Sequence, residues 1–108
     1  MGRQILLIAG ILLFFTGCAN YSFRLKGDTL HMYLKRPQAE TVYFSSSLDG
    51  YVLHRATRVD EKTWEVRLPA DGEFTYFYIV DGAVFVPPCG LREYDDFGGV
   101  NCVYTPDL

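Results

Sequence analysis

Four carboxylates in the C-terminal part of the chain have the side-chain chemistry best suited to holding a hard cation. They are Asp81, Glu93, Asp95 and Asp96. Calcium binds several carboxylate and carbonyl oxygens, but it does so in loops of defined ligand spacing, which this group does not match. We therefore expect a solvated acidic loop rather than a calcium site.

The other residues capable of chemistry are scattered. His31 and His54 fall on separate predicted strands, with no cysteine or carboxylate at ligand spacing, so no metal site is expected. The serines at 45–47 lack the context of a nucleophile elbow. A glycosidase needs two carboxylates flanking a cleft, and a small domain leaves little room for one. We expect a protein that is not an enzyme and needs no cofactor.

The N-terminal segment has the pattern of an export signal. Arg3 gives it a positive start, and residues 5–15 are almost entirely apolar. As a helix, such a run spans only about 16 Å, too short for a hydrocarbon core of about 30 Å. Residues 1–17 are therefore predicted to be a signal peptide rather than a membrane-spanning anchor.

This signal ends in Phe15-Thr16-Gly17-Cys18. The motif resembles the lipobox of bacterial lipoproteins, in which the cysteine becomes the lipidated first residue. An ordinary secretory signal followed by an incidental cysteine is the alternative. Lipidation of Cys18 with several acyl chains implies firm membrane anchoring.

The residue after the lipobox bears on location. The resemblance implies a cell-envelope protein, and Ala19 stands where the enteric sorting pattern places Asp in proteins retained at the inner membrane. We therefore expect an outer-membrane location facing the periplasm.

Two cysteines remain if Cys18 carries lipid. Cys89 and Cys102 can form a disulfide in an oxidising envelope, or they can be two separate buried thiols. A bridge would close a loop of about a dozen residues and stabilise the fold by about 3 kcal/mol.

Chain length and net charge limit the number of domains and the kinds of partner to be expected. The chain has 108 residues, which favours one domain, and its 49% hydrophobic content is ample for a core. Its net charge is -3. Lys35 and Arg36 are the only two basic residues adjacent in the sequence. Nucleic-acid binding is therefore not expected.

The mature chain is organised as short strands. Residues 73–80 alternate, with Phe74, Tyr76 and Tyr78 on one face, and Asp81-Gly82 is a tight hairpin signal. Residues 73–104 should form three strands with their connections, of which the second starts at 83 and the last spans 100–104. Upstream strands are predicted at 29–35, 41–45, 51–59 and 63–68. Residues 18–28 hold Cys18 and either an edge strand at 21–26 or a spacer on the membrane surface. Residues 29–108 should form an all-β, immunoglobulin-like antiparallel sandwich.

Several motifs of this region occur together in one family. They are SSLDGY at 46–51, WEVRL at 64–68, PADG at 69–72, YFYIVDG at 76–82 and DDFGGVNCV at 95–103. The chain thus resembles the glycogen-binding domain of the AMP-activated protein kinase beta subunit and the early-set sandwich of isoamylases and branching enzymes, carbohydrate-binding module family 48. The resemblance covers about residues 30–104 and implies an early-set sandwich.

The resemblance also implies a sugar-binding surface. Tyr51 stands at the first stacking tryptophan of the family, Phe97 at its bulky loop residue and Asn101 at its asparagine. Phe77 replaces the lysine between the two tryptophans, and Val84 replaces the second tryptophan. The expected carbohydrate-binding residues are Tyr51, Phe77, Phe97 and Asn101.

Phe77 should point outward, because Tyr76 and Tyr78 point inward. Three explanations remain open: residues 21–26 cover it, a protein or membrane surface contacts it, or a sugar binds there. Two functions follow as expectations. One is a lipid-anchored module that binds an α-glucan or another envelope polysaccharide. The other is an accessory lipoprotein that docks an envelope protein and has lost sugar binding.

Overall fold

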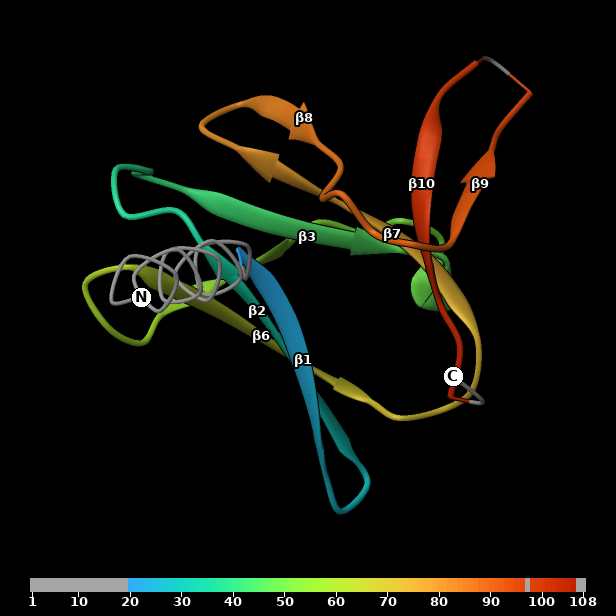
Figure 1. Cartoon of the computed structure of the whole chain (residues 1–108), viewed down its shortest axis with the longest axis horizontal. Coiled ribbons are helices and arrows are strands. Elements are labelled where there is room, and N and C mark those ends of the chain that lie inside the picture. Colours follow the sequence, from blue (N-terminus) through green and yellow to red (C-terminus); the bar gives the residue numbers. More distant parts are fainter. Residues whose placement is uncertain (1–19, 97, 107–108) are drawn as a thin grey trace, which may run out of the picture.

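The computed structural model describes residues 20–96 and 98–106, and it shows two antiparallel β-sheets packed face to face (Figure 1). The predicted signal peptide, Cys18 and Phe97 lie outside the described residues. The fold is the all-β sandwich that the strand pattern predicts. The elements are β1 (Tyr21–Lys26), β2 (Thr29–Lys35), β3 (Val42–Ser46), the 3-10 turn η1 (Ser47–Asp49), β4 (His54–Arg55), β5 (Thr57–Arg58), β6 (Thr63–Pro69), β7 (Phe74–Val80), β8 (Ala83–Phe85), β9 (Arg92–Tyr94) and β10 (Val100–Tyr104).

One sheet has the order β1-β2-β6-β5. Its first hairpin turns tightly at Gly27, which has φ 60° and lies between the paired residues Lys26 and Thr29. The segment 21–26 is thus an edge strand and not a spacer. Leu30, Met32 and Leu34 of β2 face the core, as the alternation predicts.

The other sheet has the order β4-β3-β7-β10-β9, with β8 paired to β7. The β7–β8 hairpin turns at Asp81 and Gly82, whose φ angles of 50° and 84° confirm the predicted turn. The Asp81 carboxylate accepts hydrogen bonds from the backbone N–H groups of Thr41 (2.9 Å) and Glu40 (2.8 Å). These hydrogen bonds lower the pKa of Asp81 and tie the loop before β3 to the hairpin.

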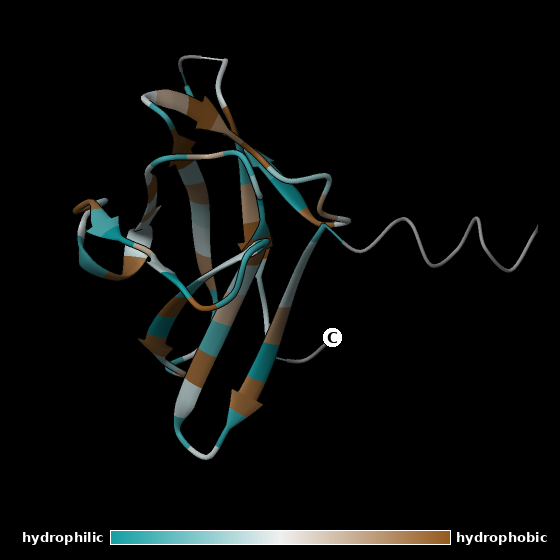
Figure 2. Cartoon of the chain, turned by 90° about the vertical axis from the view of Figure 1, so that its left-hand side faces the viewer, coloured by the Kyte–Doolittle hydropathy of each residue, from teal (hydrophilic) through white to brown (hydrophobic). Residues whose placement is uncertain are grey.

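Aromatic side chains fill the space between the sheets. Phe44 is fully buried, and its ring centroid lies 5.3 Å from that of Tyr78 and 5.5 Å from that of Tyr76. Figure 2 shows apolar and polar residues alternating along the strands, as expected where one face of each sheet is buried. Burial raises the pKa of Tyr76 to about 12. Among the described residues, the buried core side chains belong to residues from β2 onward, and Tyr21 of β1 is partly buried against them.

Two strand predictions are wrong. Residues 51–59 do not form one strand: β4 pairs with β3 in one sheet and β5 pairs with β6 in the other. The chain changes sheets at Ala56, which is 4% exposed and whose N–H donates to the Val42 carbonyl over 2.8 Å. The region 73–104 also contains four strands rather than three, because β9 pairs with β10 in a hairpin that projects from the sandwich (Figure 1).

Candidate functional site

A pair of aromatic rings lies on the outer face of the six-stranded sheet. The Tyr51 ring stacks on the Phe77 ring, with centroids 6.0 Å apart and planes inclined by 21°. The Tyr51 hydroxyl shares a 2.6 Å hydrogen bond with the Thr75 hydroxyl. Thr75 lies two residues before Phe77 in β7, on the same face of the strand. Tyr51 keeps 41% of its surface exposed. One face of its ring therefore packs against the sheet, and the side chain is held in a fixed orientation.

The local backbone delivers Tyr51 to this position. The turn η1 is capped at its start by the Ser46 hydroxyl, which accepts from the Leu48 N–H over 3.3 Å. Gly50 and Tyr51 then both take positive φ, 73° and 69°, and the Tyr51 N–H donates to the Ser46 carbonyl over 2.8 Å. Positive φ is uncommon for a tyrosine and carries a strain of order 1 kcal/mol or more. The turn thus folds the ring back over β7.

Phe77 points outward, as the alternation of β7 predicts. Of the three explanations left open for an outward Phe77, cover by residues 21–26 is excluded, because β1 belongs to the opposite sheet. Phe23 of β1 instead packs edge-on against Tyr104, with ring centroids 5.2 Å apart. The side chain that packs on the Phe77 ring is Tyr51.

Asn101 lies on the same outer face. Its neighbour Cys102 is fully buried and pairs with the inward residue Tyr76, so the side chain of Asn101 must point the other way. Asn101 is partly exposed and pairs with Glu93 of β9. Three of the four predicted sugar-contact residues, Tyr51, Phe77 and Asn101, therefore share one face. The fourth, Phe97, lies outside the described residues.

Val84 and Thr75 complete this face, which we call the aromatic face (Tyr51, Thr75, Phe77, Val84 and Asn101). Val84 pairs with Ile79 and is 68% exposed, so it adds an exposed aliphatic side chain to this face. Thr75 was not among the predicted residues. Its outward position in the β7 alternation is the only sequence signal for it.

A recess lies beside β4 and β5, where the chain changes sheets. It has a volume of about 640 Å³ and is lined by Leu48, Val66 and Leu68, with the Asp49–His54 hydrogen-bonded pair at its rim. The hydrogen bond from His54 lowers the pKa of Asp49. A single strand over residues 51–59, as the sequence predicts, would leave no such recess, so the recess has no signal in the sequence.

The other histidine has a structural partner. His31 alternates with the core residues Leu30 and Met32, so it lies on the outer face of β2, yet it is only 7% exposed. The Tyr33 ring stacks beside His31. The His31 Nδ1 atom lies 3.2 Å from Glu65 Oε2. Burial acts to raise the pKa of Glu65, but hydrogen bonds from Arg67 and His31 outweigh it and lower the pKa. Among residues 20–96 and 98–106, no three His, Cys, Asp or Glu side chains form a group able to hold a metal ion.

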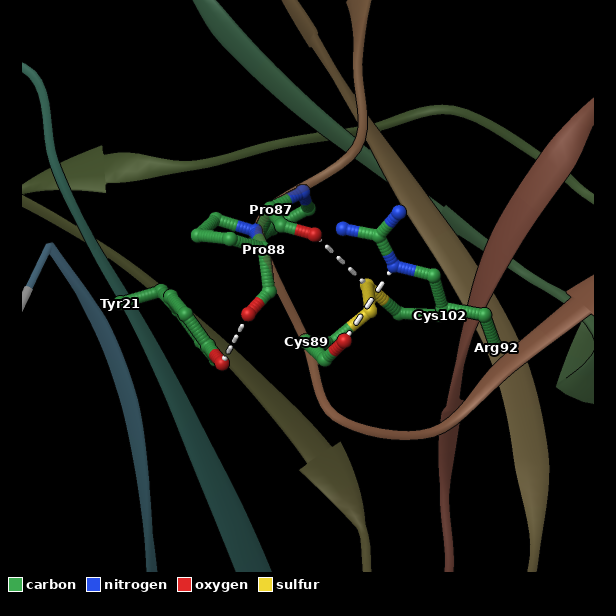
Figure 3. The surroundings of a disulfide bond; sticks show 6 residues. All are labelled: Tyr21, Pro87, Pro88, Cys89, Arg92 and Cys102. Atoms are coloured by element: carbon green, nitrogen blue, oxygen red, sulfur yellow. Dashed lines mark hydrogen bonds between the residues drawn. A yellow bond between two sulfur atoms is a disulfide. The ribbon is translucent and has the colours of Figure 1, made fainter.

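A disulfide joins Cys89 to Cys102, whose Cα atoms are 5.9 Å apart (Figure 3). Of the two alternatives left open for this pair, the structure contains the bridge rather than two separate thiols. Arg92 Nε donates to the Cys89 carbonyl over 3.2 Å, and Cys102 pairs with Arg92 across the β9–β10 ladder. The bridge therefore fastens the base of the hairpin whose second strand carries Asn101. In the same region, the Tyr21 hydroxyl donates to the Pro88 carbonyl over 2.8 Å and ties β1 to this loop.

No protein-family model matches the chain, and no curated protein matches it. In the part of the chain that the structure describes, no helix is both long and apolar enough to cross a membrane.

Proposed function

We propose that this protein is a lipid-anchored, non-catalytic module of the bacterial cell envelope that binds an α-glucan or another envelope polysaccharide through its aromatic face. The observation that carries the proposal is the Tyr51–Phe77 stack, which presents a partly exposed, hydrogen-bonded tyrosine ring on the outer surface of a sheet. The resemblance of the 46–51 and 76–82 motifs to sugar-binding sandwiches supports it.

The chemistry of the face suits a sugar ring. The apolar face of a pyranose can lie flat on an aromatic ring, and amide and hydroxyl groups can bond its hydroxyls. Tyr51 offers the ring, and Asn101 offers an amide on the same face. Because Thr75 already fixes the Tyr51 hydroxyl, little side-chain freedom is lost on binding.

A second function is favoured by the exposed aliphatic residues near this face. Val52, Leu53 and Val84 are 53%, 51% and 68% exposed, respectively. Aliphatic side chains offer no hydrogen bonds to a sugar, but they contribute to the apolar centre of protein interfaces. The alternative proposal is therefore an accessory lipoprotein that docks an envelope protein.

The proposed anchor is a lipid on Cys18. The lipobox-like segment supports it, and Ala19 supports an outer-membrane location facing the periplasm. Labelling of cells with a palmitate analogue should mark the wild-type chain and not a Cys18→Ser variant. Equal labelling of both chains would contradict the anchor.

Titration with sugars separates the two functions. The chain from Asn20 onward is titrated with maltoheptaose, glycogen and peptidoglycan fragments, with amide chemical shifts as the signal. We expect saturable shifts around Tyr51 and Asn101, and an affinity at least about tenfold weaker in Tyr51→Ala, equivalent to about 1.4 kcal/mol.

Tyr94→Ala is the matched control. Tyr94 is an even more exposed tyrosine, at 72%, and its pairing with Val100 places it at an inward position of the ladder. Its loss should leave sugar binding unchanged. No response to any of the sugars, or a response indifferent to Tyr51→Ala, would exclude the polysaccharide proposal and leave the protein-docking alternative.

A further inference from the structure

One edge of the sandwich exposes apolar side chains around an uncharged cleft. Phe23 and Leu25 of the edge strand β1 are 52% and 56% exposed, and Leu91, beside β10, is 41% exposed. Phe23 and Leu91 line a cleft of about 390 Å³ whose walls also include Tyr21 and Tyr104. None of the described residues lining this cleft carries a charged side chain. We call Phe23, Leu25 and Leu91 the apolar edge.

The path of the chain places this edge close to the predicted anchor. The Asn20 carbonyl accepts a 2.8 Å hydrogen bond from the Lys35 N–H, so the fold already holds the backbone at Asn20. Only Ala19 separates it from Cys18. An extended chain spans at most about 3.6 Å per residue, which limits the Cα–Cα distance from Cys18 to Asn20 to about 7 Å. A lipid on Cys18 would therefore hold β1 at the bilayer surface.

We propose that the apolar edge docks into the headgroup region of the bilayer that holds the lipidated Cys18. This inference rests on the lipid anchor of the proposed function and not on its sugar binding. Leu25 lies five residues after Asn20, about 17 Å along the strand at a rise of about 3.3 Å per residue. A strand standing upright would lift Leu25 out of the headgroups, whereas a strand lying along the surface inserts both Phe23 and Leu25.

The charges beside the edge suit a bacterial membrane. Arg24 and Lys26 alternate with the apolar residues of β1, and this strand contains no carboxylate. Arg92 follows Leu91 on the other side of the cleft. Basic side chains next to an inserted apolar edge are attracted to anionic lipid headgroups, while their stems lie along the apolar surface. The chain as a whole is acidic, so this local positive charge is not simply its average composition.

Docking by this edge would set the orientation of the domain relative to the bilayer. In one sheet β1 and β5 are the opposite edges, and in the other β9 and β4 are. The recess between β4 and β5 would therefore face away from the bilayer. The aromatic face would stand to the side of the contact and stay open to the periplasm.

The test uses the full-length, lipidated protein reconstituted into vesicles of phosphatidylethanolamine and phosphatidylglycerol at 3:1 with brominated acyl chains. Leu25→Trp places a reporter on the apolar edge, and Val52→Trp places one at a site of matching exposure, 53%, two residues before β4, the edge strand opposite β9. The native Trp64 is 5% exposed and supplies a common background. We expect bromine to quench the Leu25→Trp signal at least twofold more than the Val52→Trp signal.

Three results would overturn the inference. Equal quenching of both reporters would show that the domain has no preferred edge at the bilayer. A Leu25→Trp reporter shielded from both bromolipid and aqueous acrylamide would show that a second copy of the chain covers the edge. An unmodified Cys18 by mass spectrometry would remove the anchor and the docking together. A failure of sugar titration leaves all three measurements unaffected, so the two proposals fail separately.

Discussion

Opening the Cys89–Cys102 bridge is expected to lower the free energy of unfolding by about 3 kcal/mol. The two cysteines are 13 positions apart, so the bridge closes a loop of about 14 residues in the unfolded chain. The loop-closure entropy for that length is about −10 cal/mol/K, which corresponds to about 3 kcal/mol at 25 °C. For a domain of this size, whose total stability is about 5–15 kcal/mol, that is a large share.

The measurement compares one chain in two redox states. Urea unfolding of the chain from Asn20 onward is followed by the fluorescence of Trp64, the only tryptophan, with and without a phosphine reductant. Reduction keeps both sulfur atoms in place, so the fully buried Cys102 side chain leaves no cavity. The double variant Cys89→Ala/Cys102→Ala should not respond to the reductant. In that variant the stability should be lower still, because a buried side chain has been shortened.

The size of the drop in the free energy of unfolding on reduction tests the loop-closure contribution of the bridge. A loss below about 1 kcal/mol on reduction would refute the loop-entropy argument, because the unfolded loop would then gain little freedom. A reductant effect of the same size in the double variant would show that the reductant acts elsewhere. Protection of the Asn101 amide from hydrogen exchange gives a local check, since the bridge fastens the hairpin that carries this residue.

Three further predictions concern the core, the hairpin and the buried hydroxyls. Phe44→Ala should cost about 3–5 kcal/mol in urea unfolding, because the ring is fully buried among aromatic neighbours; a cost under 1 kcal/mol would mean that the core has closed around the gap. Hydrogen bonds from Thr41 and Glu40 lower the pKa of Asp81, so its contribution is present above its unfolded pKa of about 4 and lost as pH falls. Stability between pH 5 and 3 should therefore fall more steeply in the wild type than in Asp81→Asn, and parallel curves would contradict this. Burial raises the pKa of Tyr76 to about 12, so stability should fall as pH rises from about 10 through that value, by up to about 1.4 kcal/mol per pH unit, and fall less steeply in Tyr76→Phe.

Much of the sheet structure is predictable because alternation is a local property. A strand buried on one face must place apolar residues two apart, and 29–35 and 100–104 show this pattern over the lengths the structure has. The Asp81-Gly82 turn is equally local, since its requirement for positive φ falls on two adjacent residues. The inward and outward sides of β7 follow directly, including the outward Phe77.

The sheet to which a strand belongs depends on distant partners. β4 and β5 are adjacent in the chain, yet they pair with strands in different sheets because Ala56 turns into the core between them. All three residues of β9 are exposed, so they show no apolar alternation, and the strand is defined by its pairing with β10. The recess between β4 and β5 exists only because of that change of sheet.

The same distinction between local pattern and distant contact applies to the candidate site. The amino-acid sequence by itself determined that Phe77 points out of the sheet, because it is flanked by the inward residues Tyr76 and Tyr78 of its own strand. Only the tertiary structure decided that Tyr51 lies on Phe77, since the two residues meet through a 3-10 turn and two positive φ angles. Residue type and alternation determine the side of a strand, whereas contact between separate segments depends on how the whole chain packs.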